Sequence, residues 1–175
     1  MSAPDYFPLK ENWRYTYNFT SSDFSGTATV HIDILDVRKE ENKISANARM
    51  TFILRDTHVT KFEVVNDGEW LYSTNGIVTG GRKAFPIPPE TGKKWVEAPD
   101  SCRIQSMDEI CEIPAGKFEN CMKINTMIAD GDGGTASRWY APGIGLIREE
   151  YSAEDKQCEL VLMANVPLPE EKPNA

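Results

Sequence analysis

Hydrophobic and polar residues alternate with a period of two along much of the chain. Three segments near the N-terminus show this alternation, with apolar positions at Trp13, Tyr15, Tyr17 and Phe19, at Ala28, Val30, Ile32 and Ile34, and at Ile44, Ala46, Ala48, Met50, Phe52 and Leu54. In an extended strand, a period of two places alternate side chains on opposite faces. The pattern therefore predicts three half-buried β-strands, with the charged residues 39–42 forming the hairpin turn between the second and the third.

Further strands are expected at regular spacing, because turn residues separate the remaining apolar stretches. These expected strands comprise residues 57–65, 70–72, 93–97, 103–113, 117–128, 136–140, 145–151 and 158–163. Turns such as Pro114-Ala115-Gly116 lie between them, since proline fixes φ and glycine accepts positive φ. Residues 76–89 are rich in glycine and proline and form the most irregular stretch. We expect this stretch to cross from one part of the sheet to another.

These elements predict an all-β fold of roughly eleven strands, mostly paired antiparallel, with little or no helix. The chain length of 175 residues fits one domain. We place this domain at residues 6–165. Residues 1–5 and the proline-rich, charged residues 166–175 are expected to be flexible termini.

Charge and hydrophobic content exclude several functional classes. The chain has 19 Lys+Arg and 27 Asp+Glu, for a net charge of −8, and its basic residues do not cluster. A nucleic-acid partner is therefore not expected. No apolar stretch approaches the roughly 18 residues of a membrane helix, so no transmembrane segment is predicted. With 40% hydrophobic residues, the chain can bury a core.

Residues that carry catalysis or bind metals do not form a recognised pattern. His31 and His58 are the two histidines, and neither is spaced from other ligands as in a known metal-binding motif. The sequence also lacks the G-x-S-x-G motif of a serine nucleophile that a histidine could activate. Residues 130–134 (DGDGG) lack the oxygen ligands that an EF-hand needs at its fifth and twelfth positions. The adjacent Glu149 and Glu150 are interpreted as solubilising charges. We predict no catalytic, cofactor-binding or metal-binding residue, and a protein that is not an enzyme.

Four phrases of the sequence are specific in combination: YFPLKENWRY at 6–15, GKKW at 92–95, IPAGKFENC at 113–121 and WYAPGIGLI at 139–147. Together they resemble a group of uncharacterised bacterial cell-envelope proteins, labelled TapB-like among other names. Lys117 stands where threonine or serine is common in that group. The resemblance implies a single curved antiparallel sheet, a half-barrel similar to the lipoprotein-localisation-factor fold. It also implies an exported protein, often lipid-anchored, and brings no agreed activity.

Two functions remain open. The first is a non-enzymatic cell-envelope or secreted module that interacts with a protein partner or has a structural role. The second is a carrier of a lipid or other apolar ligand in the concave face of the half-barrel, with Met50, Phe52, Met122, Ile124 and Trp139 as the candidate ligand face. Core packing is the competing interpretation of those residues, and a small-molecule enzyme is a third alternative. Co-purified lipid, detected by native mass spectrometry, would favour the carrier.

Location also has two alternatives. The first five residues contain neither the basic n-region nor the apolar h-region of a signal peptide. The protein is then either cytoplasmic, or extracytoplasmic (in the periplasm or at the cell surface) with its leader removed.

The cysteines link location to strand register. Cys102, Cys111, Cys121 and Cys158 permit two disulfides. With the hairpin turn at 115–116, one residue of bulge or a slightly longer turn places Cys111 and Cys121 across from each other or nearly so, within the Cα separation that a disulfide tolerates. A one-residue mismatch would place their side chains on opposite faces. We predict that Cys111 and Cys121 lie within bridging reach, whereas all four cysteines would stay thiols in a reducing cytoplasm.

Overall fold

The described part of the chain consists of strands. The computed structural model describes residues 4–75, 82–129 and 133–170. The first six strands are β1 (Trp13–Ser21), β2 (Ala28–Lys39), β3 (Ile44–Ile53), β4 (Thr57–Asn66), β5 (Trp70–Ser73) and β6 (Lys83–Pro86). The other six are β7 (Lys94–Glu97), β8 (Asp100–Ile113), β9 (Gly116–Ile128), β10 (Gly134–Ala141), β11 (Gly145–Ser152) and β12 (Gln157–Pro167). Among the described residues, no helix is long and apolar enough to span a membrane. The all-β prediction is confirmed.

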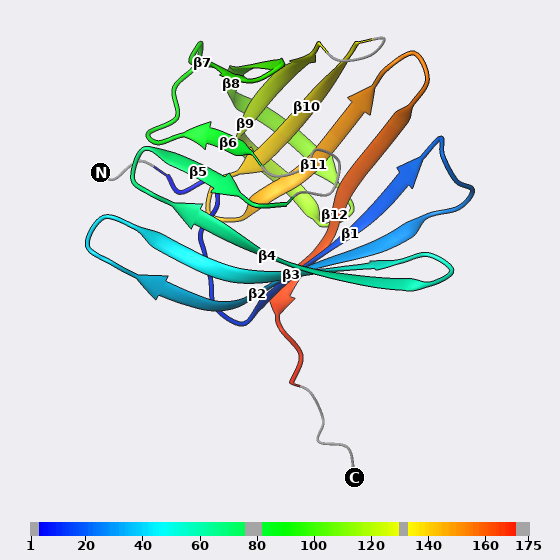
Figure 1. Ribbon diagram of the computed structural model, residues 1–175, viewed down its shortest axis with the longest axis horizontal. Helices are drawn as coiled ribbons and strands as arrows, with labels where there is room; N and C mark the ends of the chain where they lie inside the picture. Colours follow the sequence, from blue (N-terminus) through cyan, green and yellow to red (C-terminus); the bar gives the residue numbers. More distant parts are fainter. Residues whose placement is uncertain (1–3, 76–81, 130–132, 171–175) are drawn as a thin grey trace.

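All twelve strands form one antiparallel sheet. Their order across it is β6-β5-β4-β3-β2-β1-β12-β11-β10-β9-β8-β7. The chain therefore makes two meanders, β1 to β6 and β7 to β12, which meet where β1 pairs with β12 in the middle of the sheet (Figure 1). The first and last strands of the chain form the centre, and β6 and β7 are the two edges.

The sheet has twelve strands rather than roughly eleven because β6 lies within the stretch expected to be irregular. This short strand ends at Pro86, and an edge strand tolerates proline because one of its sides needs no ladder hydrogen bond. The chain then crosses from β6 to β7 at the opposite edge, as expected for the later part of this stretch, whereas residues 76–81 lie outside the described residues. The turn at residues 39–42 is also confirmed, since the Glu40 N–H donates to the Lys43 carbonyl at 2.8 Å.

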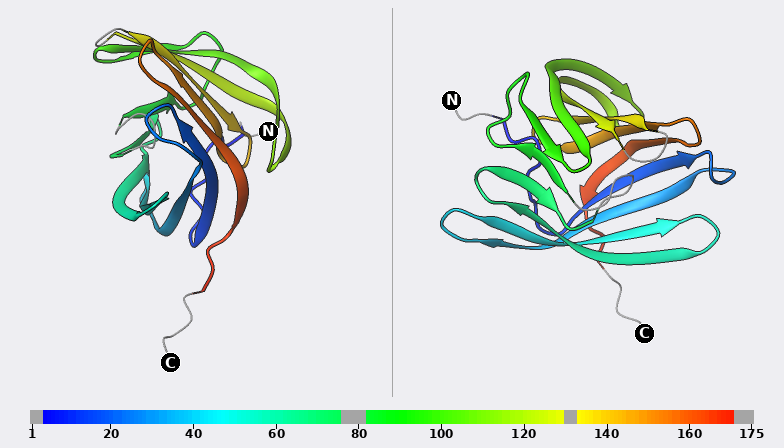
Figure 2. Two further views of the ribbon diagram at one scale, coloured as in Figure 1. Left: turned by 90° about the vertical axis from the view of Figure 1, so that its right-hand side faces the viewer. Right: turned by 45° about the horizontal axis from the view of Figure 1, so that its top comes forward.

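Strong curvature brings the two edges of the sheet close together (Figure 2). The indole rings of Trp70 on β5 and Trp95 on β7 meet edge to face, with centroids 5.7 Å apart. The Lys83 N–H on β6 donates to a carboxylate oxygen of Glu97 on β7 at 3.3 Å. Because β6 and β7 are not ladder neighbours, side chains rather than strand pairing close this nearly complete barrel.

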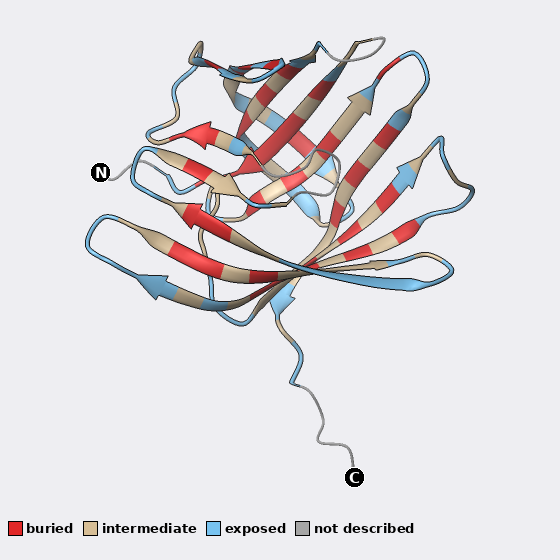
Figure 3. Cartoon of the chain, viewed as in Figure 1, coloured by how far each residue is buried: buried red, intermediate tan, exposed pale blue. Residues whose placement is uncertain are grey.

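The core fills the inner face of the curved sheet. Burial alternates along the strands, as the period of two requires (Figure 3). Fully buried side chains include Tyr15, Tyr17, Val30, Ile34, Ile104, Met122, Ile124, Leu160 and Leu162. The predicted apolar positions of the first three strands, apart from Ile44, belong to this core or pack against it.

The last residues of β12 lie beside the start of β1. Trp13 pairs with Pro167 in the β1–β12 ladder, and the Leu168 N–H donates to the Asn12 carbonyl at 2.8 Å. Regular pairing therefore continues past residue 165, which the sequence pattern gave as the domain boundary. At the other terminus, the Gly143 N–H donates to the Asp5 carbonyl at 2.7 Å.

Candidate ligand-binding cavity

A cavity of about 100 Å³ lies inside the barrel and is partly open. Its apolar wall includes Phe7, Tyr17, Ile32, Phe62, Leu71 and Leu146. These side chains come from the N-terminal segment and from strands of both meanders. The residues on β1, β2, β4 and β5 occupy inward positions of the period of two, and Leu146 on β11 pairs with the inward-facing Tyr140 beside a register shift. The cavity therefore exists only because the two meanders curl toward each other.

Two arginines and a glutamate add polar groups to this wall. Arg138 on β10 and Glu149 on β11 are directly opposite in the strand ladder, and their exposed fractions are 6% and 4%. An Arg138 Nη1–H points to the Tyr140 hydroxyl at 3.5 Å, and an Nη2–H points to the Ala84 carbonyl at 3.4 Å. Burial alone would lower the pKa of Arg138, but the neighbouring Tyr140 and Glu149 raise it. Arg138 therefore stays a protonated hydrogen-bond donor.

Arg82, just before β6, is the second arginine of the cavity wall. Its Nη2 forms an ion pair with Asp100 Oδ2 at 3.0 Å. Its Nε and Nη1 are buried, and neither has a hydrogen-bond partner among the described residues. Three N–H donors of one side chain therefore lack an acceptor, since Nε carries one hydrogen and Nη1 carries two.

The cavity tyrosines also stay protonated. Burial raises the pKa of Tyr17 well above its ordinary value, with further contributions from nearby tyrosines and Glu149. The Tyr17 hydroxyl donates to the Leu146 carbonyl at 2.7 Å. Burial likewise raises the pKa of Tyr140. These phenols are hydrogen-bonding groups at neutral pH and cannot act as phenolate nucleophiles.

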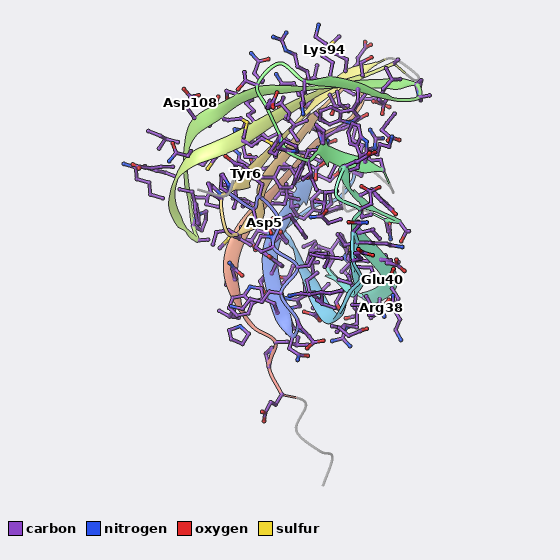
Figure 4. All side chains as sticks on the ribbon, turned by 90° about the vertical axis from the view of Figure 1, so that its left-hand side faces the viewer. Asp5, Tyr6, Arg38, Glu40, Lys94 and Asp108 are labelled. Atoms are coloured by element: carbon purple, nitrogen blue, oxygen red, sulfur yellow. The ribbon has the colours of Figure 1, made fainter. Side chains whose placement is uncertain are left out.

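The N-terminal segment separates this cavity from a second one. The second cavity, of about 170 Å³, lies between residues 4–7, Leu71 and the β6–β7 connection, and Phe7 and Leu71 line both cavities. Tyr6 is 3% exposed, and its hydroxyl donates to the Asn120 carbonyl at 3.1 Å. Figure 4 shows Tyr6 and Asp5 between the β8–β9 hairpin and the strands around β1. The segment is therefore packed into the mouth of the barrel.

The structure places four of the five predicted ligand-face residues on the inner face. Met122 and Ile124 on β9 are completely buried there, and Met50 and Phe52 on β3 pack against the core. None of the four is among the residues that line the two cavities. Their role as a ligand face stays a prediction.

Trp139 is not brought together with that set. Its strand neighbours are Lys123 and Arg148. Both cationic side chains lie over the Trp139 ring, with Lys123 Nζ 5.1 Å from the ring centroid. Because Arg138 and Tyr140 point inward, Trp139 between them points outward. Two long cationic side chains cover it, which explains why an outward tryptophan is only 8% exposed.

Cys111 and Cys121 lie on the same face of the β8–β9 hairpin. Cys121 pairs with Glu109, whereas Cys111 pairs with Phe118, and register shifts interrupt this ladder. Asn120 has a φ of 55°, in the region typical of a residue inserted at a bulge. Burial and the neighbouring Cys111 thiol raise the pKa of Cys121 to about 12. The two thiols are close enough for each to influence the pKa of the other, and all four cysteines are free.

The remaining sequence candidates fall outside the cavity. His31 lies on the outer face, where its Nδ1 is 3.0 Å from the Thr16 hydroxyl, and His58 is exposed. Glu150 also lies outside, paired with Arg148. The loop at residues 130–132, where calcium binding was considered, lies outside the described residues. No group of three or more potential metal ligands occurs among the residues that are described.

Sequence reasoning missed the polar wall of the cavity. Glu149, interpreted as solubilising, is buried and faces inward. The sequence did contain a signal for these buried charges. Arg138 is two residues from both Ala136 and Tyr140, and Glu149 is two residues from Ile147. A charge in phase with the apolar face of a strand indicates a buried polar group.

Two solved structures share this fold. A Bacteroides fragilis protein, assigned as exported and described with a YmcC-like fold, is 17% identical with a TM-score of 0.72, over 93% of this chain and 99% of that chain. A Parabacteroides distasonis protein, assigned as a lipoprotein, is 13% identical with a TM-score of 0.64, over 94% of this chain and 100% of that chain. No protein-family model and no curated protein matches the sequence. The curved antiparallel sheet implied by the sequence resemblance is confirmed, and the TapB-like assignment itself stays a prediction.

Proposed function

We propose that the protein is an extracytoplasmic, non-enzymatic β-domain that binds a small apolar ligand inside its barrel. The supporting observation is the cavity, whose apolar wall carries a few buried polar groups. Ligand sites typically have this composition, because apolar walls supply binding energy and a few polar groups fix orientation. Of the two functions expected from the sequence, this proposal takes the second, a carrier of an apolar ligand, in place of the first, an interaction or structural module. A protein partner stays a prediction.

The size of the cavity limits the ligand. An apolar cavity of about 150 Å³ holds benzene, so a cavity of about 100 Å³ encloses roughly four non-hydrogen atoms, and its open side leaves room for the rest of a slightly longer ligand. A long acyl chain needs more room. Displacement of Phe7 would join the two cavities, because this side chain lines both. We therefore propose a small ligand, and a longer acyl chain would bind only after the N-terminal segment moves.

Binding of a neutral ligand tests this function. Hexan-1-ol, titrated calorimetrically and in thermal unfolding, is expected to bind the purified protein. At a concentration about tenfold above Kd, binding should raise Tm by roughly 3–6 °C. No heat of binding and no rise in Tm would contradict the proposal.

A pair of matched variants tests the place of binding. Ala84 lines the cavity, whereas Ala164 pairs with Thr16 on the outer face. Ala84→Leu should fill the cavity and abolish hexan-1-ol binding, and Ala164→Leu adds the same bulk outside and should leave it unchanged. Equal binding by both variants would place the ligand elsewhere.

The extracytoplasmic location is part of the proposal. It is supported by the two structural neighbours, one assigned as exported and one as a lipoprotein. Fractionation of the source cells, followed by immunoblotting, is expected to recover the protein outside the cytoplasm. Recovery in the cytoplasmic fraction alone would contradict this location and leave ligand binding untouched.

A further inference from the structure

We infer that the ligand is a small amphipathic carboxylate, whose apolar part fills the cavity and whose acid group is held by Arg82. This inference rests on the proposed function and goes beyond it, because the apolar wall alone would accept a neutral ligand equally well. The observations that carry it are the buried N–H groups of Arg82, the long contacts of Arg138 and the charge balance of the cavity wall.

Arg82 provides the main recognition group. Its Nε and Nη1 are shielded from bulk water and have no acceptor among the described residues, although its Nη2 is paired with Asp100. A buried donor without an acceptor is unfavourable, and hydrogen bonds between a charged donor and a carboxylate are among the strongest in proteins. Arg82 also lines the cavity, so a rotation of its guanidinium toward the cavity would bring these donors to an acceptor on the ligand.

Arg138 is a second donor at the same wall. Its two hydrogen bonds, of 3.5 and 3.4 Å, are at the long end of the range for N–H donors. One of the two acceptors is the Ala84 carbonyl, close in sequence to Arg82. A ligand carboxylate beside Arg82 would therefore also lie near a guanidinium whose present contacts are weak.

The charge balance of the cavity wall disfavours a ligand with more than one negative charge. Arg82 and Arg138 face Asp100 and Glu149, so the formal charges of these four groups sum to zero. Recognition then depends on the unsatisfied donors rather than on excess positive charge. A carboxylate brings one charge and two acceptor oxygens, whereas a phosphate group is larger and carries nearly two charges at neutral pH. The cavity of about 100 Å³ also favours the smaller group.

The test compares two probes that share a chain. Hexanoate and hexan-1-ol, titrated calorimetrically at pH 7.5 into the full chain, differ only in the head group. Hexanoate is expected to bind at least about tenfold more tightly, since a charge-assisted hydrogen bond contributes roughly a tenfold to a hundredfold effect.

Variants then assign the preference to Arg82. Arg82→Gln should weaken hexanoate binding at least about tenfold and change hexan-1-ol binding less than about threefold. Arg103→Gln removes the same charge from an exposed position on β8 and should leave both affinities unchanged. Thermal unfolding of each variant checks that it is folded.

The outcomes separate the two proposals. A preference for hexanoate that Arg82→Gln removes and Arg103→Gln retains would support the inference. Equal binding of the two probes would overturn the inference and leave the proposed function standing. Binding of hexanoate that Arg82→Gln does not weaken would overturn the role of Arg82. Binding of neither probe would overturn the proposed function, and this inference with it.

Discussion

Single charged residues are buried on both faces of this sheet, and each has an opposite charge beside it. On the outer face, Asp33 is fully buried between Arg14 and Arg49, with Oδ1 2.7 Å from Arg14 Nε and Oδ2 2.9 Å from Arg49 Nη2. Burial alone would raise the pKa of Asp33, but the hydrogen bonds from both arginines lower it. The three strands β1, β2 and β3 place these side chains in one row across the ladder.

Removal of the Asp33 charge should destabilise the fold at neutral pH. Asp33→Asn keeps the shape but loses both ion pairs, and because the arginines are about a quarter exposed and can rehydrate, the expected loss is about 1–3 kcal/mol. The folded-state pKa is depressed, so this stabilisation is present above the unfolded pKa near 3.8 and is lost as pH falls through the folded pKa. Urea unfolding at several pH values should show the two proteins converging at acid pH. A gap independent of pH would contradict the role of the charge.

The Cys111–Cys121 pair gives a second residue-scale prediction. Oxidised glutathione is expected to take up two electrons as the two thiols lose their protons and form a disulfide. The bond should stabilise the fold by about 2–3 kcal/mol at most, because it closes a short loop. Formation should be slow at neutral pH, because the pKa of Cys121 is raised to about 12 and few thiolates are present.

Peptide mapping without prior reduction checks this bond. Cys158→Ser serves as the control, because Cys158 lies on β12 and should not alter the cross-link. Alkylation of both hairpin cysteines after oxidation would show that they do not bridge. The same peptide mapping on protein isolated from its source cells tests the proposed location.

At the scale of elements, the N-terminal segment and the β10–β11 turn depend on each other. Gly145 has a φ of +124°, and a Cβ placed on it would lie 3.0 Å from Cδ2 of Phe7. Phe7 stacks on Tyr15, with ring centroids 5.9 Å apart, and meets Tyr140 edge to face. Glycine is therefore required here both for its backbone conformation and for the close approach of an aromatic ring.

Gly145→Ala should displace Phe7 and destabilise the protein by about 1–3 kcal/mol through backbone strain and crowding. Gly143→Ala is the matched control, since Gly143 also has positive φ, +74°, but nothing lies within 4 Å of its Cβ position. Thermal unfolding should show a larger loss for Gly145→Ala. Greater near-ultraviolet circular dichroism change and faster hydrogen exchange around residues 5–8 are also expected. Equal losses of stability in the two variants would mean that backbone strain alone, and not crowding against Phe7, causes the effect.

At the scale of the whole molecule, the β1–β12 ladder holds the two meanders together. Removal of β12 would leave β1 and β11 without their shared neighbour and expose Leu160 and Leu162, which are fully buried. A chain ending at Ser152 should therefore fail to fold, whereas a chain ending at Leu168 keeps the whole ladder and should fold normally. Circular dichroism and two-dimensional NMR check both, and a folded protein from the shorter chain would contradict the prediction.

The sequence alone determined most of the strands and most of their inner faces, because both are local properties. The exceptions include the short strand β6 and Trp139, which points outward. A period of two shows which side chains of one strand share a face, and turn residues show where the strand ends. The β8–β9 hairpin followed from its turn for the same reason. Its bulge at Asn120, however, changed the partner of Cys121 from the simple register.

Only the tertiary structure decided which strands meet and what their inner faces enclose. Periodicity does not specify a neighbour, so pairing of the first strand with the last, and the close approach of β6 and β7, could not be derived from it. Arg82 and Arg138 are far apart in sequence, and a charged residue on a strand has the same local pattern whether it faces water or a cavity. Curvature of the whole sheet buries them together, because it wraps one meander around the inner face of the other.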